Sequence, residues 1–230
     1  MTADKPQIHS GLIRLARQKI HWLDRAEQVP AARADLAILR RGLGKNPGEI
    51  PEILAITLPA KDAEYHPSDL LLASGDGPPT PVEWAMHVAL TLYALHRQGQ
   101  PGSMTDNGEQ PSDGKRRPGA SFGAAMRRLR MDSQKEPGVA RRFNAMITAS
   151  DIREFARHAM GAVQMLRAAD IRMDYAAFAA DLLLFQIPTR REGIKMKWGR
   201  DFWREESKDK PTVGGTGAAQ SAGENQHDEP

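Results

Sequence analysis

Apolar residues recur at steps of three and four positions along most of this chain, and this spacing constrains its fold more than any other feature. The segment from His9 to Glu27 illustrates the pattern with Leu12, Leu15, Ala16, Ile20 and Leu23. Such spacing gathers apolar side chains on one face of an α-helix. No stretch of useful length alternates apolar and polar residues with the period of two that a half-buried strand shows. The chain is therefore predicted to be all-α.

The same pattern predicts where the individual helices lie. The predicted ranges are 9–27, 31–41, 49–58, 81–96, 121–131, 137–149, 151–168, 175–186 and 189–203. Thr80 and Glu83 have the spacing of a capping box, with Pro81 at the first helical position between them. Ser150 and Asp174 are expected to cap the two helices that follow them, and Thr189 with Glu192 repeats the capping-box spacing. Gly42 is expected to end the helix 31–41.

Two segments of the chain lack the apolar residues that a packed element needs. Between residues 98 and 119, Gly, Pro, Ser, Asp and Gln dominate, which predicts a flexible loop. We therefore expect two small helical-bundle subdomains, at residues 1–97 and 120–204, joined by the loop 98–119. The tail 205–230 has Val213 as its one large apolar residue and is expected to be disordered.

Cysteine is absent from the 230 residues, which excludes disulfides, thiol nucleophiles and thiolate metal sites. No apolar run approaches the roughly 20 residues that span a bilayer, and the N-terminus lacks the apolar core of a signal peptide. We therefore expect a cytoplasmic protein without a membrane partner.

Residues suited to catalysis or to metal binding do not form recognisable motifs. His87 and His96 are nine positions apart, on opposite sides of one predicted helix, and His158 lacks the partner of a helical zinc motif. The glycines at 214–217 lack the Lys-Ser/Thr of a phosphate loop. We predict no catalytic residue, no metal site and no cofactor. A helical hydrolase that uses His158 or Asp181 is the remaining enzymatic hypothesis.

The net charge of +3 hides an alternation of basic and acidic blocks. Residues 1–45 hold nine basic and four acidic side chains, residues 115–142 nine and two, and residues 188–204 six and two. Residues 46–114 hold two basic and ten acidic side chains, and the tail two and six. Basic blocks of this size favour an anionic partner over a merely solvated face.

Arginine predominates in the basic blocks, and its planar guanidinium matches phosphate oxygens in pairs, so we predict a nucleic-acid-binding surface. The candidate residues are Arg40, Arg41, Lys45, Arg127, Arg128, Arg130, Arg141, Arg142, Lys195, Lys197 and Arg200. A further run, Lys115 to Arg117, lies in the predicted loop. Aromatic residues of the last helix can stack on bases, although helical spacing favours the core for Trp198 and Phe202.

An ordered series of short motifs carries a resemblance to a known family. The series comprises Leu39-Arg40-Arg41-Gly42, Trp84 to His96, Ser121-Phe122-Gly123 with Leu129, Arg141-Arg142-Phe143, Asp174-Tyr175 with Asp181-Leu182, and Trp198-Gly199-Arg200-Asp201-Phe202. In this order, between residues 9 and 204, the chain resembles the CasB family, the small subunit of the type I-E Cascade CRISPR surveillance complex. The segment 98–119 is longer than that resemblance leads us to expect, and the tail also departs from it.

The resemblance implies a non-enzymatic, all-helical subunit of an antiviral defence complex. It implies two copies packed head to tail beside the large subunit and the backbone subunits that hold the CRISPR RNA. The implied role is sequence-independent binding of single- and double-stranded DNA and RNA that stabilises the R-loop. Modest phosphate contacts suffice for this, because the RNA–DNA hybrid is about as stable as the duplex that it replaces. The functional arginines of the family map onto Arg40, Arg41, Arg141 and Arg142, and also onto Arg127, Arg128 and Arg130.

A protein–protein adaptor is the alternative that the residues leave open. In that case the arginines would meet acidic patches on neighbouring subunits, and the acidic block 46–114 would face a basic block of a second copy. One continuous basic groove would favour nucleic-acid binding, whereas three separated patches would favour the adaptor.

Overall fold

The computed structural model describes residues 5–59, 77–108, 118–132 and 136–204. These residues form nine α-helices and one short 3-10 helix, η1, at Arg25–Glu27. The α-helices are α1 (Lys5–Asp24), α2 (Pro30–Arg41), α3 (Pro51–Thr57), α4 (Pro81–His96), α5 (Phe122–Asp132), α6 (Glu136–Ile147), α7 (Ile152–Ala168), α8 (Tyr175–Phe185) and α9 (Pro188–Trp203). The prediction of an all-α protein is confirmed, and each predicted helix is present with ends that differ by a few residues.

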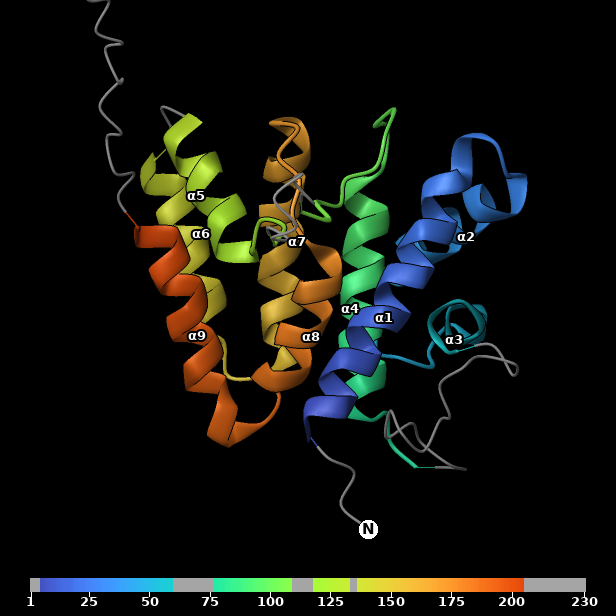
Figure 1. Cartoon of the computed structure of the whole chain (residues 1–230), viewed down its shortest axis with the longest axis horizontal. Helices are drawn as coiled ribbons and strands as arrows, with labels where there is room; N and C mark the ends of the chain where they lie inside the picture. The colour runs from blue at the N-terminus through green and yellow to red at the C-terminus, as the bar shows by residue number, and fades with distance from the viewer. Residues whose placement is uncertain (1–4, 60–76, 109–117, 133–135, 205–230) are drawn as a thin grey trace, which may run out of the picture.

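The helices α4, α7 and α8 lie between two groups of helices (Figure 1). On one side α1, α2 and α3 flank α4, and on the other side α5, α6 and α9 pack together. Contacts of α1 and α4 with α8, and of α4 with α7, join the two halves of the chain. One hydrophobic cluster therefore runs from Leu12 to Phe202, and the division at residues 98–119 stays a prediction about domain boundaries.

Polar caps fix the starts of three helices. The capping box predicted at α4 is confirmed: the Glu83 backbone N–H donates to Thr80 Oγ1, and the Thr80 N–H donates to the Glu83 carboxylate at 2.7 Å. Asp174 caps α8 as predicted, accepting from the Ala177 N–H at 2.9 Å. The prediction for α7 was wrong by one residue, because Asp151 accepts the Glu154 N–H at 2.8 Å and is the N-cap.

The capping box predicted for α9 is wrong. The helix begins at Pro188 after Ile187, whose side chain makes no capping hydrogen bond. Proline at the first helical position has no N–H to satisfy and already has a helical φ, so this helix can start without a capping hydroxyl. Thr189 is therefore inside the helix and exposed.

The described part of the segment 98–119 is held against the helices. Met104 and Thr105 are buried, and the Asp106 N–H donates to the Met173 carbonyl at 2.9 Å. The Asp106 carboxylate in turn accepts the Ala120 N–H at 2.9 Å. The composition of the segment did not indicate these contacts. Two buried residues, Met104 and Thr105, and the hydrogen bonds of Asp106 are enough to hold residues 98–108 against the helices, and so few residues hardly change a polar composition. Residues 109–117, with Lys115 to Arg117, and the tail 205–230 lie outside the described residues.

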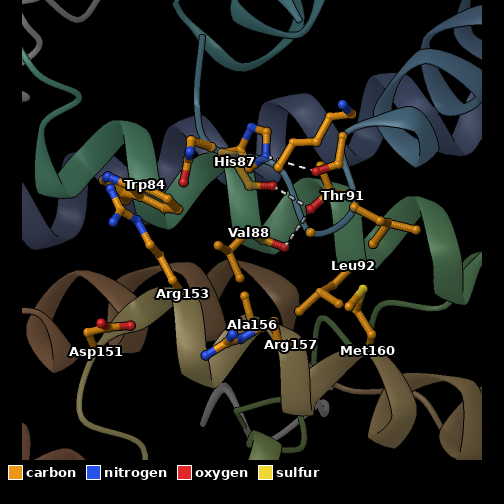
Figure 2. Close-up of a pocket in the computed structure, with 15 residues that line it drawn as sticks. Trp84, His87, Val88, Thr91, Leu92, Asp151, Arg153, Ala156, Arg157 and Met160 are labelled. Atoms are coloured by element: carbon orange, nitrogen blue, oxygen red, sulfur yellow. Dashed lines mark hydrogen bonds between the residues drawn. The ribbon is translucent and has the colours of Figure 1, made fainter. Parts of the chain in front are cut away.

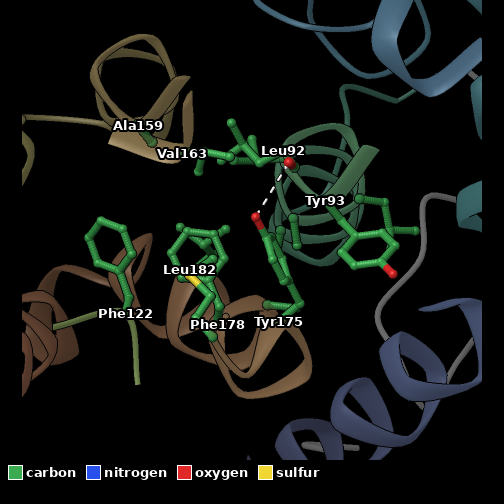
Figure 3. Packing of buried hydrophobic residues seen from close by; sticks show 14 of the residues in the cluster. Leu92, Tyr93, Phe122, Ala159, Val163, Tyr175, Phe178 and Leu182 are labelled. Carbon is green, nitrogen blue, oxygen red and sulfur yellow. Dashed lines mark hydrogen bonds between the residues drawn. The ribbon is translucent and has the colours of Figure 1, made fainter. Parts of the chain in front are cut away.

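Aromatic side chains form the centre of the core (Figure 3). Phe122 of α5 lies 5.2 Å from Phe178 of α8 and 5.3 Å from Trp198 of α9, measured between ring centroids. The Tyr175 hydroxyl donates to the Leu92 carbonyl at 3.4 Å, which ties α8 to α4 (Figure 3). Trp198 and Phe202 are fully buried, as their helical spacing predicted.

A buried histidine makes the stability of this core depend on pH. Burial, with a smaller contribution from Arg167, lowers the pKa of His96 to about 4. The unfolded chain therefore takes up a proton between about pH 6.5 and pH 4 that the folded chain does not, and stability falls as pH falls. Between pH 7 and pH 4 this proton uptake should lower the free energy of unfolding of the wild type by on the order of 2 kcal/mol. We expect His96→Gln not to show this decrease. Urea denaturation at both pH values measures it.

The matched control for this experiment is His158→Gln, because His158 is exposed on α7. This variant should lose stability with acidification as the wild-type chain does. Equal acid sensitivity of His96→Gln and the wild type would contradict the assignment to His96.

Candidate nucleic-acid interface

The first basic block surrounds the end of α2. Arg41 is exposed, whereas Arg40 is half-buried beside Arg97, and desolvation lowers the pKa of its guanidinium. Arg97 Nη2 pairs with Glu27 Oε1 at 2.9 Å. Lys45 follows α2 in the turn 42–46 and lies 4.0 Å from Glu49 Oε2, with both side chains exposed.

A cleft of about 250 Å³ lies at the surface between α4 and α7 (Figure 2). Residues 42–46 also line it. Of the described residues that line it, Lys45, Arg153 and Arg157 are cationic, and Asp151, which caps α7, is the one carboxylate. The Arg153 guanidinium lies 5.2 Å from the centre of the Trp84 ring (Figure 2). Among the described residues, Arg153 and Arg157 have no carboxylate within 4 Å, so the cleft is electropositive.

A histidine forms part of the wall of this cleft without adding charge. His87 is 3% exposed, and its Nε2 donates to the Gly42 carbonyl at 3.2 Å, which fixes the turn after α2 against α4. Burial lowers the pKa of His87, so its ring is neutral near pH 7. The positive charge of the cleft therefore comes from Arg153 and Arg157, with a smaller share from Lys45, which lies 4.0 Å from Glu49 Oε2.

The second basic block lies on α5 and α6. Arg128 is exposed and lies 4.0 Å from Asp106 Oδ2, whereas Arg127 is half-buried. The Arg130 guanidinium lies 5.2 Å from the Phe202 ring and 4.9 Å from the Trp203 ring, which orients it toward the end of α9. On α6, Arg141 and Arg142 are both exposed.

The third basic block, on α9, is partly neutralised by ion pairs. Lys197 Nζ donates to both oxygens of the buried Asp181 carboxylate, at 2.7 and 2.8 Å, and Trp198 Nε1 donates to the same group at 2.8 Å. Lys195 Nζ lies 3.2 Å from Glu192 Oε1. Arg200 is exposed and has no carboxylate within 4 Å among the described residues. The lysines of this block therefore offer less free charge than their number suggests.

These contacts also bear on the hydrolase hypothesis. The Asp181 carboxylate is 3% exposed and is occupied by Lys197 and Trp198, which is a structural role. His158 lies on the exposed face of α7, with Glu154 at 3.9 Å. The described residues contain no group of three or more His, Cys, Asp or Glu placed to hold a metal ion.

The structure separates the basic blocks into two ends. Figure 1 shows α2 at one end of the long axis and α5, α6 and α9 at the other. The second and third blocks meet, because α5 packs against both α6 and α9. The first block lies apart from them, with α4, α7 and α8 between.

Comparison with known proteins identifies the family. The family model for the CRISPR-associated protein Cse2 matches residues 35–203, nearly the whole described chain after α1. The chain belongs to the Cse2 family of CRISPR-associated proteins. Among solved structures, CasB from Thermobifida fusca is similar with a TM-score of 0.62 and 26% identity, covering 85% of this chain and 97% of that one.

Two structures from Thermus thermophilus show the same fold at lower identity. One, a CRISPR-associated protein of the Cse2 family, has a TM-score of 0.52 and 24% identity, and the other, a CasB, has 0.52 and 20%. Each covers 82% of this chain and 97% of its own. A search of curated proteins found no match. The resemblance to CasB that the sequence motifs indicated is confirmed at the level of the family.

The predicted set of binding residues does not include Arg153 and Arg157, the two arginines of the cleft. They lie in a segment, 143–187, whose basic and acidic residues nearly balance, so block charges did not reveal them. Their spacing of four residues on one helix was the available signal, because it puts both on one face. Only the packing of α4 on α7 shows that this face borders a cleft.

No described helix has the length and apolarity needed to cross a membrane.

Proposed function

We propose that this Cse2-family protein is a non-enzymatic, cytoplasmic subunit of a CRISPR RNA-guided surveillance complex that stabilises the R-loop. It binds target and displaced DNA strands, and CRISPR RNA, through their backbones and without sequence preference. Its protein partners are a second copy, the large subunit and the backbone subunits.

The observation that carries this proposal is the supply of exposed arginines without acidic partners. Among the described residues, Arg41, Arg141, Arg142 and Arg200 are exposed and have no carboxylate within 4 Å. A guanidinium that is not neutralised within its own protein is available for a phosphate. The membership of the Cse2 family supports a place for such a surface in a CRISPR complex.

Binding by these arginines is expected to be sensitive to salt and to charge reversal. Arg141→Glu with Arg142→Glu should weaken the binding of single-stranded DNA at least about tenfold at low salt, because two attractive contacts become repulsive. For the wild type, the logarithm of the affinity should fall by about 0.7 per logarithmic unit of salt for each phosphate contacted. Fluorescence anisotropy with labelled oligonucleotides of two unrelated sequences measures both effects.

The control variant carries the same change of charge elsewhere. Arg25 and Arg172 are exposed residues outside the predicted set, so Arg25→Glu with Arg172→Glu lowers the net charge equally. This variant should bind nearly as the wild type does. Equal losses in both double variants would mean that net charge alone matters. A purified chain that ignores DNA at low salt but co-purifies with other subunits would favour the adaptor.

A further inference from the structure

A glycine on α7 connects two of the separated basic regions. A Cβ atom added at Gly161 would collide with the Arg142 guanidinium, so the side chain of Arg142 crosses from α6 and lies directly over this glycine. Gly161 follows Arg157 by four residues, and Arg157 follows Arg153 by four. These three positions share one face of the helix, each about 6 Å along the axis from the next. Three guanidinium groups therefore line one face of α7.

The turn after α2 approaches the same part of α7 from the opposite side of the cleft. A Cβ at Gly44 would lie 3.9 Å from Met160 Cε, and Met160 is the neighbour of Gly161. Lys45 follows Gly44 and lines the cleft with Arg153 and Arg157. The first basic block therefore reaches α7 through Lys45, and the second reaches it through Arg142.

We propose that Lys45, Arg153, Arg157 and Arg142 form a track on which one single strand of nucleic acid lies along α7. The inference rests on the proposed function and names a site within it. Successive phosphates contact Arg153, Arg157 and Arg142, and Lys45 lines the cleft with Arg153 and Arg157 from the turn after α2. The track lies between the first basic block and the second, which Figure 1 shows at opposite ends of the molecule.

The dimensions and charges favour a single strand over other anions. The cleft has about 250 Å³, which is small for a ligand pocket. Its two arginines and the Arg142 guanidinium over Gly161 form a row about 12 Å long on α7, which is longer than one phosphate requires. A duplex holds its two backbones in a fixed geometry, whereas a single strand is flexible enough to place successive phosphates on neighbouring residues of one helix. Neutral His87 and the Trp84 ring covered by Arg153 line the cleft without adding charge.

The central test removes Arg153 and Arg157, the two arginines of the track on which the proposed function does not rest. We expect Arg153→Ala with Arg157→Ala to weaken the binding of a single-stranded oligonucleotide about tenfold. The salt dependence should become shallower by about 0.7 for each phosphate that is no longer bound. The affinity for a duplex of the same length should fall much less. Arg25→Ala with Arg172→Ala, at exposed positions outside the track, serves as the matched control.

A second variant tests the track without changing any charge. Gly161→Leu keeps every arginine but fills the space that the Arg142 guanidinium occupies. We expect a several-fold weaker affinity for the single strand and a salt slope shallower by about 0.7, the share of one phosphate. Gly138→Leu on α6 is its control, because a Cβ there meets no atom within 4 Å. Circular dichroism and thermal unfolding establish that each variant is folded.

The outcomes separate this inference from the proposed function. If the wild-type chain binds no single-stranded DNA at low salt, the proposed function fails and the track with it. If the wild type binds and Arg141→Glu with Arg142→Glu weakens binding, but the Arg153/Arg157 variant binds with unchanged affinity and salt slope, the track alone is overturned. Equal losses for single strand and duplex would overturn its preference for a single strand.

Discussion

Replacing Trp198 with alanine is expected to lower the free energy of unfolding by about 3–5 kcal/mol. Trp198 is 0% exposed and lies with its ring centroid 5.3 Å from Phe122, 5.3 Å from Phe155 and 6.0 Å from Phe185. Alanine would leave a cavity where helices α5, α7, α8 and α9 meet. It would also remove the N–H that donates to the buried Asp181 carboxylate at 2.8 Å. Urea denaturation at pH 7 measures the loss.

The control for this prediction is a second tryptophan on the same helix. Trp203 is 51% exposed and contacts Phe202 edge-on, with Arg130 beside it. Trp203→Ala should cost no more than about 1 kcal/mol, because little buried area is removed. If the two variants were equally destabilised, Trp198 would not be at the centre of the core as described.

Replacing Gly123 with alanine is expected to destabilise the protein by about 2–3 kcal/mol through overpacking. A Cβ at this position would collide with the Trp198 carbonyl oxygen and lie 3.0 Å from Asp201 Cβ. Both obstacles are on α9, and one of them is backbone, so α5 and α9 would have to separate. This destabilisation should therefore exceed the stability that alanine gains over glycine from its higher helix propensity.

Gly199 provides the matched comparison on the opposing helix. It lies on α9 next to Trp198, and a Cβ there would meet no heavy atom within 4 Å. Gly199→Ala should stabilise the protein by about 0.5–1 kcal/mol, because alanine costs less backbone entropy in a helix than glycine does. Thermal and urea unfolding of both variants measure the difference in sign. A stabilising Gly123→Ala would contradict the close approach of α5 and α9.

The helices could be predicted from the sequence because their signals are local. Thr80 with Glu83 and Asp174 with Ala177 are three residues apart, and the apolar faces repeat within single helices. The N-caps predicted at Ser150 and Thr189 are wrong because a residue next to each one starts the helix instead. Asp151 caps α7, and α9 begins at Pro188. Local signals are thus reliable for the presence of a helix and less so for its first residue.

The candidate interface could be predicted only in part. The arginines of α5 and α6 are exposed as their position on amphipathic helices indicated, except that Arg127 and Arg130 are half-buried. Lys197 is engaged by Asp181, sixteen residues earlier in the chain, and no pattern of charges along α9 indicates this pair. Arg153 and Arg157 lie in a segment of balanced charge, where no basic block marks them. Their roles in binding stay predictions.

The sequence by itself determined the all-α class, the places of the helices and the supply of arginine, because periodicity, capping and composition depend on residues close together in the chain. The tertiary structure alone decided which cations are neutralised and which are brought together. Asp181 pairs with Lys197 because α8 packs on α9, and Arg142 reaches Gly161 because α6 packs on α7. Such contacts depend on how helix faces meet across long separations in sequence, and one helix's own sequence does not specify its neighbour.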